Sequence, residues 1–241
     1  MSKVTLNYLI LSLFILLSST VGGLAITRKL EDWGAAQNYL LYSLPVAFCV
    51  FLSQCIVFHK AKNRLLYQII FWGLINLTMT WMMLSLFFPI FWISFLEIKY
   101  KIIMASFFLF ITGANLMHGW RATIKQWLAI GQALFKTEID KKKQEVDWDT
   151  IVRKMGISNG LFIPCVPKKW NSAVSIILIF LMIVGLNLRA IYPIFSVFAW
   201  GIPATVVSSF FFQMVSYYFA QASIIKKIET SKKIILRSVG K

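Results

Sequence analysis

Residues 65–88 read LLYQIIFWGLINLTMTWMMLSLFF and carry no charged side chain. About 20 consecutive apolar residues are enough to cross the roughly 30 Å hydrocarbon core of a bilayer as a helix. A helix that is apolar on every face belongs in a membrane or at the centre of a large soluble core. The stretch therefore predicts a transmembrane helix, and Pro89 directly after it predicts the end of that helix or a kink.

The same apolar pattern recurs along the whole chain. Further uncharged or nearly uncharged stretches cover residues 4–26, 39–58, 102–117, 172–188 and 191–225. The chain is 59% apolar, against about 45–50% for soluble globular domains, and its mean hydropathy is +0.72. We therefore predict an all-α, polytopic transmembrane helical bundle of about six spans. Spans 1–4 lie within residues 1–117, and spans 5 and 6 within residues 171–225.

The first apolar stretch has a second interpretation. Lys3, the apolar run 9–17 and the small residues that end at Ala25 also fit a cleaved secretory signal peptide. The stretch over residues 4–26 is long enough to cross a bilayer. We therefore favour a retained span, with signal peptide cleavage as the alternative.

The basic residues are distributed unevenly about these spans. If the N-terminus lies inside, the inner segments contain all 25 Lys and Arg residues except Arg28, Lys29, Lys99, Lys101 and Arg189. Lys and Arg accumulate on the cytoplasmic side of membrane proteins. This asymmetry predicts an even number of spans in a bacterial inner (plasma) membrane, with both termini cytoplasmic. The net charge of +16 is then explained by contact with the anionic inner leaflet, and no nucleic-acid partner is expected.

The one sizeable polar segment covers residues 118–170 and is predicted to be a cytoplasmic or interfacial loop with short helices. Within it, Asp147 is a typical N-cap and Gly156 a typical C-terminal cap. The short helix between them is a candidate docking element for a partner protein. Its candidate contact residues are Asp147, Trp148, Arg153 and Lys154. Residues 226–241 are predicted to be a basic cytoplasmic tail.

A polar stripe follows the fourth span where it leaves the membrane. It consists of Asn115, His118, Arg121 and Lys125. Spacings of three and four residues place these side chains on one helix face. They could form a site for an anion or a lipid headgroup at the inner interface. The commoner explanation of such side chains is that they reach toward the interface without binding a ligand.

The sixth apolar stretch, residues 191–225, is too long for one straight span. At about 1.5 Å per residue it would measure about 50 Å, more than a bilayer core even with tilt. Gly201 and Pro203 predict a break in the helix, and interrupted helices line the sites of many transporters. Ser209 and Gln213 after the break either line a pore or form bonds to neighbouring helices, and helix packing is the commoner role.

The sequence shows no catalytic or metal-binding constellation. All nine acidic residues lie in loops or near span ends, and the two histidines are His59 and His118. An ionisable residue in the middle of a span is expensive and usually marks a functional site. We therefore expect no catalytic residue, no metal and no cofactor.

Three functions remain open from the sequence. The favoured hypothesis is a non-enzymatic protein that acts by protein–protein interaction, in assembly, in exclusion or immunity, or as an anchor of a membrane complex. Its partner is another protein or further copies of the chain. The richness in Lys, Ile, Phe and Asn favours an AT-rich gene, such as one on an accessory genetic element. The alternative is a channel or passive transporter, formed by one chain or by an oligomer. A lipid-modifying enzyme is the third and least favoured hypothesis.

Overall fold

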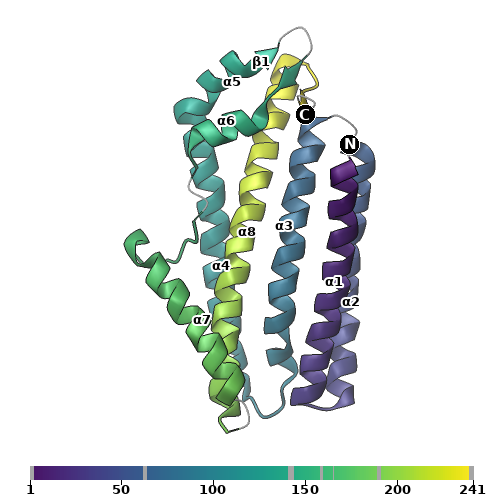
Figure 1. The fold of residues 1–241 in the computed structure, drawn as a ribbon, viewed down its shortest axis with the longest axis vertical. Coiled ribbons are helices and arrows are strands. Elements are labelled where there is room, and N and C mark those ends of the chain that lie inside the picture. Colours follow the sequence, from purple (N-terminus) through teal and green to yellow (C-terminus); the bar gives the residue numbers. More distant parts are fainter. Residues whose placement is uncertain are drawn as a thin grey trace.

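A computed structural model describes residues 3–61, 64–140, 144–157, 160–164, 166–188 and 191–238. Long helices run side by side along one axis, with a group of shorter elements at one end (Figure 1). The long helices are α1 (Lys3–Leu30), α2 (Trp33–Ala61), α3 (Leu65–Phe87), α4 (Ile98–Gln126) and α8 (Pro193–Lys232). The prediction of an all-α helical bundle is confirmed.

Among the residues that the structure describes, five segments are long and apolar enough to cross a membrane. They are Thr5–Leu30, Trp33–Ala61, Leu65–Trp92, Ile98–Thr137 and Ile194–Lys232. The helix α7 (Asn171–Leu188) is also apolar but shorter, and it packs along α8 (Figure 1). The chain is therefore a multi-pass membrane protein by helix length and composition, with five span-length helices where the sequence predicted about six.

Helix α3 ends where the sequence predicted. Its last residue is Phe87, and the 3₁₀ helix η1 (Phe88–Trp92) follows with Pro89 in its first turn. Proline has no backbone N–H and fixes its own φ, so it starts a new helical turn more easily than it continues the old one.

Helices α3 and α8 form the centre of the bundle. Half of the α3 span and 61% of the α8 span are buried, compared with 22–28% of the other three spans. The α1–α2 pair packs on one side of α3, while α4 and α7 pack on α8. The outward faces of α1, α2 and α4 carry exposed large apolar side chains, as lipid contact requires.

A buried polar network joins the first three helices. Ser12 Oγ donates to Gln54 Oε1 at 2.6 Å and lies 2.7 Å from Thr78 Oγ1. Gln54 Nε2 donates to Thr78 Oγ1 at 2.7 Å and to the Leu74 carbonyl at 2.9 Å. In a span, polar side chains must find protein partners because no water is present. The network therefore fixes the register of α1 and α2 against α3.

The predicted break in the sixth apolar stretch is wrong. Helix α8 is continuous over 40 residues, and Pro203 lies inside it. Neighbouring helices make an interior proline tolerable in a membrane helix. Gly201 permits close packing: a Cβ there would lie 2.7 Å from Ile90 Cδ1 and 3.1 Å from Met104 Cε. At about 1.5 Å per residue α8 measures about 60 Å, which carries it beyond the apolar bundle.

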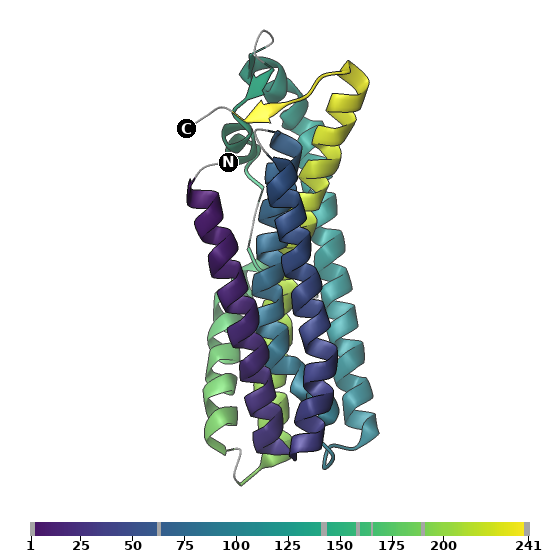
Figure 2. The same cartoon turned by 90° about the vertical axis from the view of Figure 1, so that its right-hand side faces the viewer.

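The shorter elements form a folded unit, which we name the head, at the end where α1 begins and α8 ends (Figures 1 and 2). The head contains the π-helical turn η2 (Trp127–Gly131), α5 (Gln132–Glu138), β1 (Ile139–Asp140), β2 (Glu145–Val146), α6 (Trp148–Met155) and β3 (Arg237–Ser238). Strands β1 and β2 pair antiparallel, and β3 pairs parallel to β2. The remaining element, η3 (Lys168–Trp170), precedes α7.

Residues 226–238 do not form a separate tail, and residues 239–241 of the predicted tail lie outside the described residues. Helix α8 continues to Lys232, and the chain then turns back so that β3 joins the head sheet, with Arg237 opposite Glu145 (Figure 2). Lys233 makes this turn in the left-handed region, with φ +51°. The C-terminal segment is thus part of the head as far as Ser238.

Candidate functional site

The head has its own apolar core. Trp127, Phe135, Trp148 and Met155 are buried in it together with Leu236 from the C-terminal segment. The Trp127 and Trp148 rings lie 5.7 Å apart, centroid to centroid. Because these residues come from η2, α5, α6 and the C-terminal segment, burial of their side chains holds these four stretches of chain together.

The capped helix α6 has the ends that the sequence predicted. Asp147 Oδ1 accepts the Thr150 N–H at 3.1 Å, and Gly156 adopts the left-handed conformation after the last turn. Both predicted caps are confirmed. The apolar face of α6, however, packs into the interior of the head.

The candidate docking residues therefore lie on different sides of α6. Trp148 is 2% exposed, and its Nε1 donates to Gln221 Oε1 on α8 at 2.7 Å. Arg153 and Lys154 are exposed. A partner could meet these two basic side chains, whereas Trp148 holds α6 against α8.

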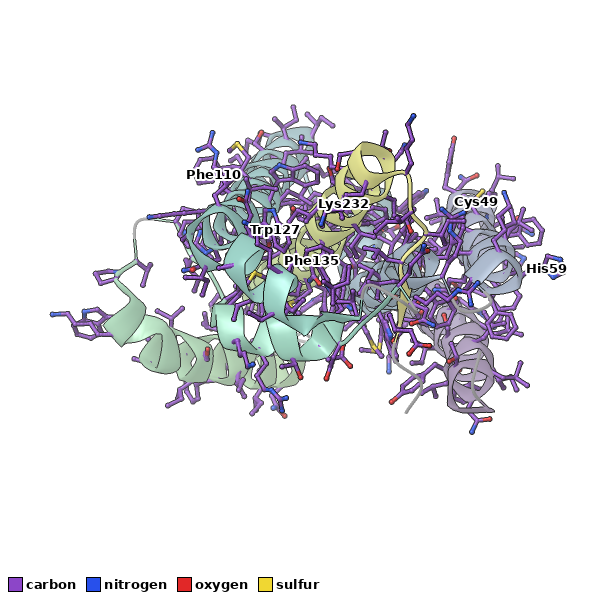
Figure 3. All side chains as sticks on the ribbon, turned by 90° about the horizontal axis from the view of Figure 1, so that it is seen from above. Cys49, His59, Phe110, Trp127, Phe135 and Lys232 are labelled. Carbon is purple, nitrogen blue, oxygen red and sulfur yellow. The ribbon has the colours of Figure 1, made fainter. Side chains whose placement is uncertain are left out.

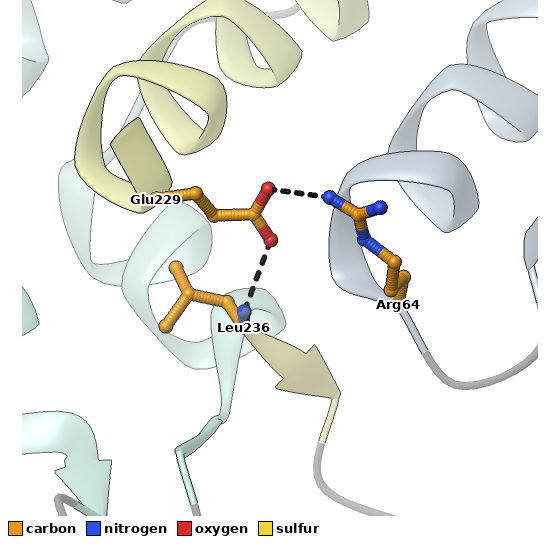
Figure 4. A network of polar contacts seen from close by, with 3 residues as sticks. All are labelled: Arg64, Glu229 and Leu236. Atoms are coloured by element: carbon orange, nitrogen blue, oxygen red, sulfur yellow. Dashed lines mark hydrogen bonds and ion pairs between the residues drawn. The ribbon is translucent and has the colours of Figure 1, made fainter. Parts of the chain in front are cut away.

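A buried carboxylate closes the head onto the bundle. Glu229 is 8% exposed, and its Oε2 lies 3.1 Å from Arg64 Nη2 in the turn before α3 (Figure 4). Its Oε1 accepts the Leu236 N–H at 3.0 Å. The Leu65 N–H in turn donates to the Leu236 carbonyl at 3.0 Å. A charge buried at this depth is stable when it is both paired and hydrogen-bonded.

The outer surface of the head is strongly basic. Its exposed basic residues are Lys125, Lys136, Arg153, Lys154, Lys226, Lys227, Lys232, Lys233 and Arg237. Seen from above, Lys232 lies with Trp127 and Phe135 at the centre of this end, whereas His59 lies at the periphery (Figure 3). Lys232 Nζ is 4.8 Å from the Phe135 ring centroid. Exposed basic side chains thus outnumber exposed acidic ones, such as Asp149, on a surface built from segments far apart in sequence.

The predicted stripe on α4 does not form one open site. Asn115 is fully buried and donates from Nδ2 to the Ile111 carbonyl at 2.9 Å and to Ser209 Oγ at 3.3 Å. The His118 ring stacks on Phe162 with centroids 4.2 Å apart. Arg121 and Lys125 are exposed. The structure therefore separates the buried member of the stripe from its two charged members.

The predicted pore residues on α8 make helix contacts. Ser209 Oγ donates to the Val206 carbonyl at 2.7 Å, and Gln213 Nε2 donates to the Gly160 carbonyl at 3.2 Å. Ser209 Oγ also accepts from Asn115 Nδ2 on α4, and the Gln213 backbone lies against Gly119 of α4. Both residues are therefore on the face of α8 that packs on α4. Two buried acceptors at this interface, Asn115 Oδ1 and Gln213 Oε1, have no hydrogen-bond partner among the described residues.

A cavity of about 670 Å³ lies between the start of α3 and the end of α8. Arg64, Lys226 and Glu229 line its head end, while Ile70 and Phe219 line it farther into the bundle. Sequence analysis missed this cavity because its two walls are more than 150 residues apart. The sequence does show a basic residue at each of the two helix ends, Arg64 and Lys226. It does not show that these two ends lie side by side.

Within the described part of the chain, no group of three or more His, Cys, Asp or Glu residues is arranged to hold a metal ion. Comparison with known protein families, with curated proteins and with solved structures found no match. The features of the molecule that bear on its function are therefore the bundle, the head and the charge of the head.

Proposed function

We propose that this chain is a non-enzymatic, multi-pass protein of a bacterial inner membrane that binds an acidic partner protein through its head. The observation that carries the proposal is the basic head surface, to which α4, α5, α6 and α8 all contribute. A folded surface with an excess of basic side chains attracts and orients an acidic partner. Assembly, exclusion or anchoring within a membrane complex are the roles that such binding would serve.

The positive-inside asymmetry supports a cytoplasmic head. Because α1 begins and α8 ends at the head end (Figure 1), the chain between α4 and α8 must return to the other end of the bundle. Helix α7 makes most of this return, and at about 1.5 Å per residue its 18 residues measure about 27 Å. That length is close to the thickness of a bilayer core. We therefore propose α7 as the sixth span.

The test combines purification with charge reversal. The double variant Arg153→Glu/Lys154→Glu reverses two exposed charges on α6, and Arg28→Glu/Lys29→Glu reverses two at the opposite end of the bundle. Purification from native membranes in mild detergent, with quantitative mass spectrometry, should give a stoichiometric acidic protein with the wild type and the control. With the α6 variant, recovery of this acidic protein should fall at least about tenfold. Salt should weaken the binding because it screens exposed charges.

Two outcomes contradict this proposal. One is the absence of a stoichiometric partner from the wild-type preparation. The other is equal recovery of the partner with the α6 variant and with the control at the opposite end.

A channel is the second candidate function, because two buried acceptors between α4 and α8 have no hydrogen-bond partner in the described part of the chain. Buried polar atoms without protein partners are where water enters a membrane protein. Ion flux into liposomes that contain the wild type, compared with Gln213→Leu, tests it. Flux that the variant abolishes supports a channel, and the absence of flux from the wild type excludes one under those conditions.

A further inference from the structure

We propose that the cavity between α3 and α8 binds the headgroup of an anionic phospholipid. This proposal does not depend on the partner protein. Its basis is a cavity of about 670 Å³ whose lining changes from charged to apolar along the bundle axis. The five helices long and apolar enough to cross a membrane include α3 and α8, which form the walls of this cavity.

The polarity of the lining matches the polarity of a lipid. Arg64 and Lys226 lie at the head end of the cavity, six and seven residues from Ile70 and Phe219 along α3 and α8. At 1.5 Å per residue these pairs are about 10 Å apart along the helices. The interfacial layer that separates headgroups from the hydrocarbon core has a similar depth. A phosphate at the basic end would therefore leave its acyl chains beside Ile70 and Phe219.

The charged end has unused capacity to bind a phosphate. Arg64 gives Nη2 to Glu229, and 38% of its side chain remains exposed. Its guanidinium lies over the Tyr67 ring at 5.1 Å, which holds its plane. Lys226 is exposed at the rim. These two cations outnumber the Glu229 carboxylate, so the lining carries a net positive charge that suits a phosphodiester.

The apolar part of the lining identifies the source of the phosphate. A free phosphate ion or a soluble phosphate ester would gain nothing from Leu66, Ile70 and Phe219. An acyl chain would cover these side chains and would approach laterally from the bilayer. The cavity therefore fits a phospholipid and not a soluble anion.

Native mass spectrometry of the full-length protein, released from nanodiscs of phosphatidylcholine with phosphatidylglycerol, tests the proposal. Wild-type protein should retain phosphatidylglycerol in preference to phosphatidylcholine. Lys226→Gln removes the exposed cation of the cavity and should weaken retention about fivefold, as expected for one basic residue at an anionic surface. Lys227→Gln, the adjacent exposed lysine outside the lining, should leave retention unchanged.

A second variant tests the cavity itself. Ser223→Trp fills the space from a half-buried position in the lining, and Ser231→Trp places the same side chain on the exposed surface. Only Ser223→Trp should lower phosphatidylglycerol retention, with thermal unfolding in detergent confirming that both variants fold. Equal retention by Lys226→Gln and Lys227→Gln, or no preference for phosphatidylglycerol over phosphatidylcholine, overturns the proposal. So does inorganic phosphate alone if it raises the unfolding temperature as much as the lipid does.

Discussion

At the residue scale, the Glu229 carboxylate joins the end of α8 to two other parts of the chain. It contacts the turn before α3 through Arg64 and the C-terminal segment through the Leu236 N–H (Figure 4). Glu229 lies in a part of the protein that is rich in Lys and Arg, so several basic side chains are available to pair with it. The hydrogen bond to Leu236 explains why the carboxylate is held at this position and not at the surface.

We predict that Glu229→Gln destabilises the protein by about 1–2 kcal/mol. Removing one member of a fully buried ion pair costs about 3–5 kcal/mol, but Arg64 is 38% exposed and solvent screens part of the interaction. Unfolding in mixed micelles with increasing SDS, followed by circular dichroism, gives the value. Glu97→Gln is the control because the Glu97–Lys99 pair is well exposed. Equal stability of the two variants would mean that the buried pair contributes nothing.

A second prediction concerns the polar network among α1, α2 and α3. Gln54→Leu removes the side chain that contacts both Ser12 and Thr78. These two hydroxyls remain 2.7 Å apart and can still bond to each other, so we expect a loss of only about 0.5–1.5 kcal/mol. Gln37→Leu on the exposed face of the same helix should leave stability unchanged in the same unfolding experiment.

At the element scale, the closest approach of α4 to α8 depends on a glycine. A Cβ at Gly119 would lie 2.5 Å from the Gln213 backbone carbonyl oxygen. Backbone cannot move aside as a flexible side chain can, so any larger residue must push the helices apart. Small residues permit this kind of close contact in membrane helices.

We therefore predict that Gly119→Ala destabilises the bundle by about 1–3 kcal/mol through overpacking. Gly113 lies on the same helix with open space where its Cβ would be. Gly113→Ala should leave stability unchanged or raise it by about 0.5–1 kcal/mol, because alanine favours the helix. Unfolding midpoints of the two variants, measured together, check the prediction, and a neutral Gly119→Ala would contradict the close α4–α8 packing.

At the scale of the whole molecule, the head and the opposite end of the bundle should lie on different sides of the membrane. We predict that a cysteine at Ser231, in the head, reacts with a membrane-impermeant maleimide only after lysis. A cysteine at Gly34, exposed at the start of α2, should react in intact spheroplasts. Cys49, Cys55 and Cys165 are first replaced by serine. The reverse pattern would place the head outside and rule out a cytoplasmic partner.

The sequence by itself determined the class of fold and several helix ends. Uncharged stretches such as residues 65–88 predicted the spans because transfer of apolar side chains into lipid depends little on which neighbours they meet. The end of α3 before Pro89 and the caps of α6 at Asp147 and Gly156 were also predicted. These features depend on residues within a few positions of one another, so a local reading of the chain captures them.

Only the tertiary structure decided the continuity of α8, the position of the C-terminal segment and the sites. Gly201 and Pro203 predict a break when read alone, but packing against Ile90 and Met104 explains the glycine within a continuous helix. The Arg64–Glu229 pair and the α3–α8 cavity join residues 165 positions apart. Such contacts follow from which helix faces meet, and that depends on the packing of the whole bundle and not on any one stretch of sequence.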